Sequence, residues 1–314
     1  MKILSNLSSF NETAPSFVTI GTFDGVHIGH QKVLKKLVKS AKNNNATSIL
    51  LTFFPHPRMV LQKDVEIKLI NTIDERIQLL KKTGIDTLVV YPFDETFANQ
   101  TALNFVRKFL VAKLNIVKLF IGYDHRFGKN REGDFEHLKE YGHAYNFGVK
   151  EISKLDINNI GVSSTKIRLA IENGEIEKAN QYLGYHFMIT GNVVKGRNLG
   201  EKIGFPTANL FVKENYKLLP KTGAYIVKTV INNNVIYGMM NIGYRPTLKG
   251  KHQTIEVHFF DFNENLYDKI IQIEVLKFLR NEQKFESVQN LKKQLKKDKQ
   301  NSLNYIHKQY TLNK

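Results

Sequence analysis

The sequence predicts an α/β domain followed by a smaller, β-rich domain. In the first part of the chain, short apolar runs alternate with amphipathic segments, a pattern typical of a parallel sheet covered by helices. In the second part, turn residues such as Asn232-Asn233-Asn234 separate short β-rich stretches, which indicates a small antiparallel barrel or sandwich. A chain of 314 residues also exceeds what one core usually holds. We therefore expect domains over residues 1–184 and 185–314.

The elements of the first domain follow from its hydrophobic pattern. Residues 72–75, TIDE, form a capping box that should begin one helix, and Gly84 should end that helix. Two short helices should close the domain, each ended by a glycine. The expected strands cover residues 17–20, 48–54, 87–91 and 117–121, and the expected helices cover residues 33–41, 74–82, 102–112, 164–173 and 175–183.

The most informative segment is residues 21–30, GTFDGVHIGH, which lies between an expected strand and an expected helix. Backbone N–H groups and the positive end of the helix dipole make such a turn a natural phosphate site. His27 and His30 are three positions apart with a glycine between them, so both imidazoles can reach a phosphate held there. This arrangement predicts phosphoryl or nucleotidyl transfer, which depends on positioning and on neutralising charge at phosphorus. A tight turn with two incidental histidines is the structural alternative.

Further loops with unusual residues are expected at the same edge, because ligands of parallel sheets collect at the carboxyl ends of the strands. They are residues 55–58, PHPR, and residues 122–128, GYDHRFG. Residues 163–168, SSTKIR, should begin a helix with hydroxyls and free N–H groups and add Arg168 about one turn later. This combination suits the β- and γ-phosphates of a nucleotide. A plain helix cap would account for the serines alone.

The second domain is predicted to contain five β-rich stretches and a terminal helix. The apolar pattern of Val288, Leu291 and Leu295 predicts an amphipathic helix. The dense lysines at residues 292–297 are then expected on its solvent-exposed face. The expected strands cover residues 187–194, 224–231, 235–241, 254–262 and 270–278, and the helix covers residues 286–299.

A second candidate site lies in residues 204–209, GFPTAN. In an extended segment the oxygens of Thr207 and Asn209 lie on one side, because these residues are two positions apart. Neutral oxygens suit Mg²⁺ that is held chiefly by nucleotide phosphates and water. A simple turn is the alternative. Residues 254–260 alternate so that Glu256 lies on the polar face, either as a solvated charge or as a base for a hydroxyl.

Composition excludes several classes of protein. The absence of cysteine excludes disulfides, a thiolate nucleophile and a thiolate zinc site. No apolar run approaches the roughly 20 residues that cross a bilayer, and the N-terminus lacks the features of a secretory signal. We therefore expect a cytoplasmic protein with no membrane partner. The formal charge of +17 leaves a nucleic-acid-binding protein as the alternative from another class, although basic patches interleaved with aromatic residues are not evident.

These motifs resemble those of one enzyme family. Residues 21–30 resemble the GxFDGxHxGH signature of the HxGH nucleotidyltransferases, and residues 163–168 resemble their second, SSTxxR-type phosphate motif. Residues 53–57, FFPHP, and residues 122–128 narrow the resemblance to bacterial FAD synthetases, the bifunctional riboflavin kinase/FMN adenylyltransferases. The GFPTAN motif is similar to the signature of the riboflavin kinase barrel. The resemblance covers nearly the whole chain, in the family's order.

The resemblance implies a Rossmann-like HxGH nucleotidyltransferase domain, followed by a six-stranded antiparallel β-barrel riboflavin kinase domain with a C-terminal helix. It implies ATP- and Mg²⁺-dependent phosphorylation of riboflavin to FMN, and adenylylation of FMN to FAD with release of pyrophosphate. The implied partners are the small molecules riboflavin, FMN and ATP, with no nucleic acid. The oligomeric state is left open.

The resemblance also implies a role for particular residues. His27 and His30 would stabilise charge at the α-phosphate and on the leaving pyrophosphate, while Glu256 would activate the 5′-hydroxyl of riboflavin. Thr207 and Asn209 would contact Mg²⁺ and the ATP phosphates. The remaining implied residues are Gly21, Thr22, Phe23, Asp24, Ser164, Thr165 and Arg168 for the nucleotide, Phe54, His56, Pro57, Asp124 and Arg126 for the flavin of the adenylyltransferase, and Arg245 and Arg280 for the flavin pocket of the kinase.

Two departures from the family pattern concern ligand binding. His125 stands where the flavin loop of the family has a phenylalanine. Leu199 and Glu201 stand where the glycine-rich loop usually carries arginines. We expect this loss of positive charge to weaken ATP binding at the kinase site. The enzymatic alternative is therefore an FMN adenylyltransferase whose barrel has lost kinase activity.

Overall fold

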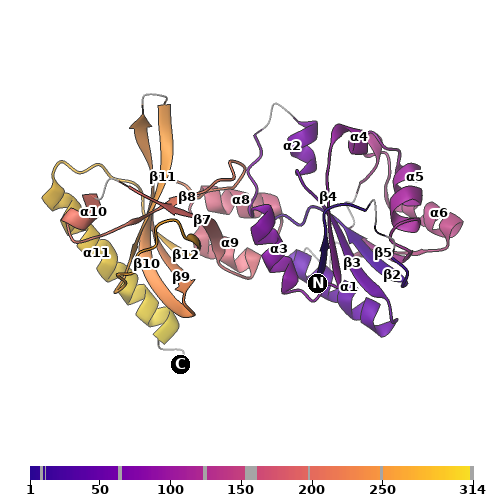
Figure 1. Cartoon of the computed structure of the whole chain (residues 1–314), viewed down its shortest axis with the longest axis horizontal. Helices are drawn as coiled ribbons and strands as arrows, with labels where there is room; N and C mark the ends of the chain where they lie inside the picture. The colour runs from indigo at the N-terminus through magenta and orange to yellow at the C-terminus, as the bar shows by residue number, and fades with distance from the viewer. Residues whose placement is uncertain are drawn as a thin grey trace. The chain divides into compact units, whose positions relative to one another are not determined.

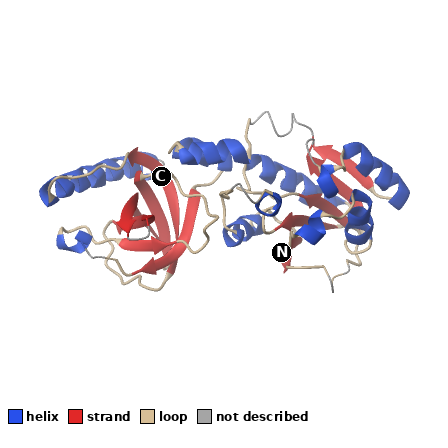
Figure 2. Cartoon of the chain, turned by 90° about the horizontal axis from the view of Figure 1, so that it is seen from above, coloured by secondary structure: helices blue, strands red, loops and turns tan. Residues whose placement is uncertain are grey.

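The structure, a computed structural model, describes residues 1–7, 10, 12–62, 66–122, 126–152, 161–196, 199–247 and 250–311. The chain divides into two compact units, Met1–Ser164 and Thr165–Lys314 (Figure 1). In each unit the strands, red in Figure 2, belong to a single sheet. Among the residues so described, no helix is long and apolar enough to cross a membrane.

The first unit is built on a six-stranded sheet with the strand order β1-β4-β3-β2-β5-β6. All neighbouring strands pair in parallel, which confirms the predicted α/β class. The strands are β1 (Lys2–Leu4), β2 (Ser16–Ile20), β3 (Thr47–Phe53), β4 (Thr87–Tyr91), β5 (Ile116–Gly122) and β6 (Gly148–Ile152). The helices are α1 (Ile28–Asn43), α2 (Pro57–Leu61), α3 (Ile73–Lys81), α4 (Glu95–Ala98), α5 (Ala102–Phe105), a π-helical turn (Val106–Val111), a 3-10 turn (Lys129–Arg131) and α6 (Phe135–Tyr145).

The strand order creates a topological switch point beside β2. From β2 the chain continues through β3 and β4 on one side, and then returns to β5 and β6 on the other side. The loops that leave β2 and β5 therefore diverge at the carboxyl edge of the sheet, where ligands of such sheets bind. Because β2 is buried along its whole length, the loop at residues 21–27 leaves from the centre of the core.

The second unit is a closed barrel with the strand order β10-β11-β8-β7-β12-β9, which confirms the predicted six-stranded barrel. Every neighbouring pair is antiparallel. The strands are β7 (Phe187–Val194), β8 (Ala208–Phe211), β9 (Gly223–Ile231), β10 (Asn234–Thr247), β11 (Gly250–Phe259) and β12 (Ile270–Arg280). The helices are α8 (Ser164–Glu172), which begins at the end of the first unit, α9 (Ile176–Leu183), α10 (Leu199–Lys202), α11 (Val288–Ile306) and a closing π-helical turn (His307–Thr311).

The C-terminal helix α11, yellow in Figure 1, packs against β10. A hydrophobic cluster that includes Phe260, Leu276 and Ile306 fills this contact. On β11, Ile255, Val257 and Phe259 are all buried, as their alternation predicted. Elsewhere in the unit, α9 contacts β12 and β7. The Asn180 side chain donates to the Val275 carbonyl (2.9 Å) and accepts from the Phe187 N–H (2.7 Å).

Several short elements were not predicted. Strands β1, β6 and β8 have three to five residues and expose much of their length, so they carry little hydrophobic signal. The predicted helix at residues 102–112 is instead one α-helical turn that passes into a π-helical one. The capping box of α3 is present as predicted: Thr72 accepts from the Glu75 N–H (3.1 Å), and the Glu75 carboxylate accepts from the Thr72 N–H (3.0 Å).

Candidate active sites

The loop between β2 and α1 has an unusual backbone. Phe23, Gly25 and Val26 all have positive φ angles, 47°, 86° and 37°, which side-chain-bearing residues adopt only where the surroundings enforce them. A hydrogen bond from the Val26 N–H to the Phe23 carbonyl (3.0 Å) closes the turn. Helix α1 then begins at Ile28 with His27 as its N-cap.

The two histidines of the loop stack on each other. Their ring centroids are 3.6 Å apart and their planes differ by 16°. The Phe23 ring lies against His30 at 4.8 Å. Nδ1 of His27 accepts the N–H of His30 (3.3 Å), so a neutral His27 carries its proton on Nε2. The stack therefore fixes one ring as a helix cap and leaves its Nε2–H as a directed donor.

Burial keeps both imidazoles neutral near pH 7. It lowers the pKa of His27 from 6.5 to about 4, against an opposing effect of the Asp24 carboxylate. Burial also lowers the pKa of His30 well below 6.5, and the charges of His27 and Arg76 act in the same direction. Nδ1 of His30 is buried without a hydrogen-bond partner among the described residues. A neutral histidine pair beside a helix N-terminus can bind a phosphate through hydrogen bonds without carrying charge itself.

Ser164 of the second phosphate motif contacts the first motif within the first unit. Oγ of Ser164 donates to the main-chain carbonyl of Asp24 (2.8 Å). Ser164 thus reaches the residue 21–27 loop from a distant part of the sequence. Thr165 and Arg168 follow on α8, in the second compact unit. Their contacts with a nucleotide stay predictions.

The Asp24 carboxylate is engaged within the protein. It is buried and accepts the N–H groups of Ile70 (3.1 Å) and Asn71 (3.4 Å). These amides lie directly before α3, so the carboxylate fastens the loop to the start of that helix. Gly21 is required for packing, because a Cβ there would lie 2.9 Å from the Phe23 ring. A contact of Gly21, Thr22, Phe23 or Asp24 with the nucleotide stays a prediction.

Arg76 is a member of this site that the sequence did not single out. Its side chain is fully buried, and Nη1 donates to the Thr22 carbonyl (2.8 Å). A signal was present, because Arg76 lies on the buried face of α3 together with Leu79 and Leu80, where an apolar residue is expected.

The described parts of the predicted flavin loops follow β3 and β5 at the same edge of the sheet. His56 is buried and caps α2, since its Nδ1 accepts the Arg58 N–H (3.2 Å), and Pro57 is the first helical residue. The Phe54 N–H donates to the Tyr91 carbonyl (3.1 Å). Asp124 and His125 lie outside the described residues. Arg126 is exposed and donates to Asp134 (2.9 Å), which also contacts Nδ1 of His137 (2.8 Å).

The candidate kinase residues converge on neighbouring barrel strands. Asn209 of β8 is directly opposite Glu256 of β11, and Asn241 of β10 is opposite Glu256 on its other side. Oγ1 of Thr207 is 3.5 Å from the Glu256 carboxylate. Since opposing residues of antiparallel strands point to the same face, the side chains of Asn209, Asn241 and Glu256 share one face of the sheet. The sequence alone did not predict that these three side chains lie together, because β8 is distant in the chain from β10 and β11.

The same residues fit a magnesium–nucleotide complex. Gly196 lies so close to the Asn209 amide that a Cβ at this position would overlap it, so the backbone forms a cradle around that amide. No group of three or more histidine, cysteine, aspartate or glutamate side chains in the described parts of the chain suits a metal ion. A hard cation here would therefore be held by Thr207 and Asn209 together with phosphates and water, which is the usual coordination of Mg²⁺ in nucleotide sites.

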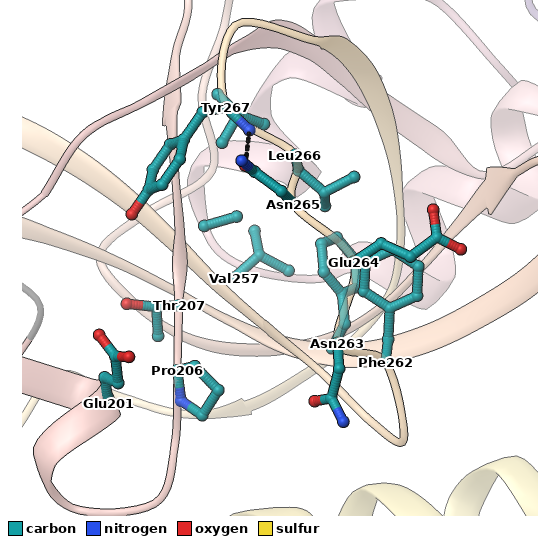
Figure 3. A pocket seen from close by; sticks show the side chains of 13 residues that line it. Glu201, Pro206, Thr207, Val257, Phe262, Asn263, Glu264, Asn265, Leu266 and Tyr267 are labelled. Atoms are coloured by element: carbon teal, nitrogen blue, oxygen red, sulfur yellow. Dashed lines mark hydrogen bonds between the residues drawn. The ribbon is translucent and has the colours of Figure 1, made fainter.

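A cavity of about 400 Å³ opens beside Thr207 (Figure 3). Aromatic and aliphatic side chains, among them Phe262, Leu266 and Tyr267, line one part of it. Glu201 and Thr207 lie at the same end in this view. Thr207 is the residue shared by this cavity and the polar group, since its Oγ1 is 3.5 Å from the Glu256 carboxylate.

Comparison with known proteins identifies the family. A family model described as FAD synthetase matches residues 9–166, and one described as riboflavin kinase matches residues 183–306. A bifunctional riboflavin kinase/FMN adenylyltransferase of Buchnera aphidicola subsp. Schizaphis graminum is 41% identical over 299 residues, which cover 94% of this chain and 95% of the relative. The chain belongs to the bifunctional riboflavin kinase/FMN adenylyltransferase family.

Further similarities are to a second family member and to a solved structure. The family member of Bacillus subtilis is 38% identical over 301 residues and covers 94% of each chain. A crystal structure of a Streptococcus pneumoniae protein, described as a macrolide-efflux protein, superposes with a TM-score of 0.87 at 30% identity and covers 96% of this chain and 98% of its own. Because both family models match one chain, the bifunctional interpretation is favoured over an adenylyltransferase with an inactive barrel.

Arg280 of this family member is paired with a carboxylate of the C-terminal helix. Its Nε and Nη2 donate to the carboxylate of Asp298 on α11 (2.9 and 2.8 Å to Oδ2). Gln294 donates to the same carboxylate (2.8 Å). This largely buried pair ties the end of β12 to the C-terminal helix. Arg245 lies in β10, and a flavin contact of Arg245 or Arg280 stays a prediction.

Proposed function

We propose that this chain phosphorylates riboflavin to FMN in the barrel and then joins FMN to the AMP part of ATP, forming FAD and releasing pyrophosphate. The carrying observation is the stacked, neutral histidine pair at the start of α1. We assign residues 1–184 to the adenylyltransferase and residues 185–314 to the kinase. The contact of Ser164 with the Asp24 carbonyl supports this assignment, because it brings the first hydroxyl of the nucleotide-binding set to the histidine loop.

In the adenylyltransferase, an oxygen of the FMN phosphate attacks the α-phosphorus of ATP. A new P–O bond forms while the bond between the α-phosphorus and the bridging oxygen breaks, and pyrophosphate leaves with that oxygen. The attacking oxygen is already ionised, so no base is needed. His27, through Nε2–H, and His30 donate to the oxygens on which charge develops. We assign Gly21, Thr22, Phe23 and Asp24 to the loop that surrounds the phosphates, and Ser164, Thr165 and Arg168 to the β- and γ-phosphates.

An aromatic cluster supports flavin binding near this site. Phe53 and Tyr91 end β3 and β4, and the rings of Phe93 and Phe97 pack against them, with centroid distances of 4.9 to 5.6 Å. Partly buried aromatic faces suit a planar isoalloxazine ring. We place the flavin of FMN beside this cluster, with the loops of Phe54, His56, Pro57, Asp124 and Arg126 around it.

In the kinase, Glu256 accepts the proton of the riboflavin 5′-hydroxyl as that oxygen attacks the γ-phosphorus of ATP. ADP leaves with the bridging oxygen. Thr207 and Asn209 hold the phosphates together with Mg²⁺, which when bound neutralises phosphate charge. The cavity beside Thr207 suits the base of ATP, since its apolar lining and polar end match an adenine ring joined to phosphates. We assign Arg245 and Arg280 to the flavin side of this site.

The substrates are small molecules, and we place the reactions in the cytoplasm, where riboflavin and ATP meet. No nucleic-acid partner is proposed. Chromatography of the flavins formed from riboflavin, ATP and Mg²⁺ tests the function directly. We expect both FMN and FAD from the wild type, and FAD from Glu256→Ala only when FMN is supplied. A wild type that makes FAD from FMN but never uses riboflavin would contradict the kinase assignment, and a wild type that makes no flavin nucleotide would contradict the whole proposal.

A further inference from the structure

We propose that Arg76 is a positioning residue of the adenylyltransferase site. Its buried guanidinium binds the backbone of the histidine loop and keeps this loop in its active conformation. The inference rests on the proposed adenylylation of FMN. It concerns a residue of α3 that lies outside both of the motifs from which the site was recognised in sequence. Its side chain is fully buried, so it acts through the loop and not by contact with substrate.

The contact with Thr22 orients the backbone of the loop. Nη1 of Arg76 donates to the Thr22 carbonyl (2.8 Å), and Oγ1 of Thr52 donates to the same oxygen (3.2 Å). In a trans peptide the carbonyl and the following N–H point in opposite directions. Fixing the Thr22 carbonyl toward α3 therefore turns the Phe23 N–H away from α3. The Phe23 side chain, in turn, packs on His30 (4.8 Å).

The start of α3 braces the loop at a second point. The Asp24 carboxylate accepts the N–H groups of Ile70 and Asn71, directly before the Thr72 cap of α3. Arg76 and these amides thus hold Thr22 and Asp24, the residues on either side of Phe23. This double attachment explains how Phe23 keeps a positive φ angle of 47°.

Arg76 also provides permanent charge where the histidines provide none. The Asp24 carboxylate raises the pKa of His27, while His27 and Arg76 lower the pKa of His30. Among these groups, the Arg76 guanidinium stays protonated over the whole pH range in which proteins are studied. A fixed positive charge in a poorly solvated place favours an incoming triphosphate and opposes protonation of His30.

The test compares Arg76→Met and Arg76→Lys with a control variant, Arg107→Met, which removes an exposed arginine from the same unit. For Arg76→Met we expect kcat of FAD formation from FMN to fall about 10- to 100-fold, the range for losing a hydrogen bond from a charged donor. The KM for FMN should stay unchanged, because the residue does not contact the flavin. Riboflavin phosphorylation by the same chain and the Arg107→Met variant should both keep wild-type rates.

Titration of the His30 imidazole by NMR in the ligand-free protein distinguishes a positioning role of Arg76 at the histidine pair from a role only in the stability of the fold. In Arg76→Met the pKa of His30 should rise toward 6.5, because a neighbouring positive charge is lost. In Arg76→Lys the charge remains, so the titration should not move and part of the rate should return.

Two results would overturn the proposal. One is a wild-type kcat for FAD formation in Arg76→Met. The other is an equal loss of rate in both variants with an unmoved His30 titration, which would indicate a purely structural residue. If Arg76→Met does not fold, Arg76→Gln, which also removes the charge, takes its place, and a wild-type kcat in that variant decides against the proposal. Failure of the proposed function would look different, because the wild type itself would then form no FAD.

Discussion

Acid should destabilise the N-terminal domain through His27. The pKa of this imidazole is about 4 in the folded protein, against its ordinary value of 6.5 in the unfolded chain, because burial disfavours the charged form. The unfolded chain therefore binds a proton at a pH where the folded chain does not. Stability is fully present above pH 6.5 and is lost as the pH falls from 6.5 toward 4. The loss between pH 7.5 and 5.0 is about 2 kcal/mol from this residue alone.

The geometry explains why the folded state resists the proton. Nδ1 of His27 accepts the His30 N–H, so a proton on Nδ1 would break the N-cap of α1. The stacked ring of His30, whose centroid is 3.6 Å away, is itself held neutral, so a charge on His27 would be poorly solvated. His30 should add a loss of the same sign.

Hydrogen exchange with mass spectrometry can measure this effect in the full chain. The free energy of opening α1 is obtained at pH 5.0 and 7.5, with correction for intrinsic exchange rates, for the wild type and for His27→Gln. The wild type should lose about 2 kcal/mol more than the variant over this interval, because glutamine does not titrate. An equal loss in both proteins would refute the reasoning, as would a wild type that is more stable at pH 5.0.

Three further predictions concern the barrel. Gly196→Ala should lower kcat/KM for riboflavin phosphorylation at least about 10-fold, because the added methyl group displaces the Asn209 amide. FAD formation from supplied FMN is the control. An unchanged rate of riboflavin phosphorylation would contradict the assigned role of Asn209. Glu201→Gln should lower the KM for ATP of the kinase about two- to fivefold, because Glu201 is an exposed negative charge that lines the cavity proposed for ATP. The KM for ATP in FAD formation should not move. Asp298→Ala should destabilise the barrel by about 2–3 kcal/mol, because the largely buried Arg280 loses its ion pair and keeps its hydrogen bond to the Asn281 carbonyl. Calorimetry that detects no lowered transition would rule out a structural role for this pair.

The class of each domain was readable from the sequence because it depends on local periodicity. Alternating apolar and amphipathic runs indicated the parallel sheet, and the capping box at Thr72 marked the start of α3 correctly. The short strands β1 and β8 escaped prediction, since three or four residues carry no period. Their place depends on pairing with β4 and β11, which only the folded chain defines.

The proximity of site residues was predictable only where the residues belong to the same sequence motif. His27 and His30 lie within one turn, so their proximity followed from the helix start. The approach of Ser164 to Asp24, and of Glu256 to Thr207, joins segments that are distant in sequence and is set by tertiary packing. Packing also explains why the Asp24 carboxylate binds amides before α3 and why Arg280 pairs with Asp298. A sequence motif names these residue types but not their partners.

The most direct test of the account is the flavin profile that His30→Ala produces from riboflavin, ATP and Mg²⁺. If the stacked imidazoles bind the phosphates during adenylyl transfer, the variant should accumulate FMN at the wild-type rate and form little or no FAD. The intact barrel of the same protein serves as the internal control. FAD formation at the wild-type rate by this variant would contradict the central claim.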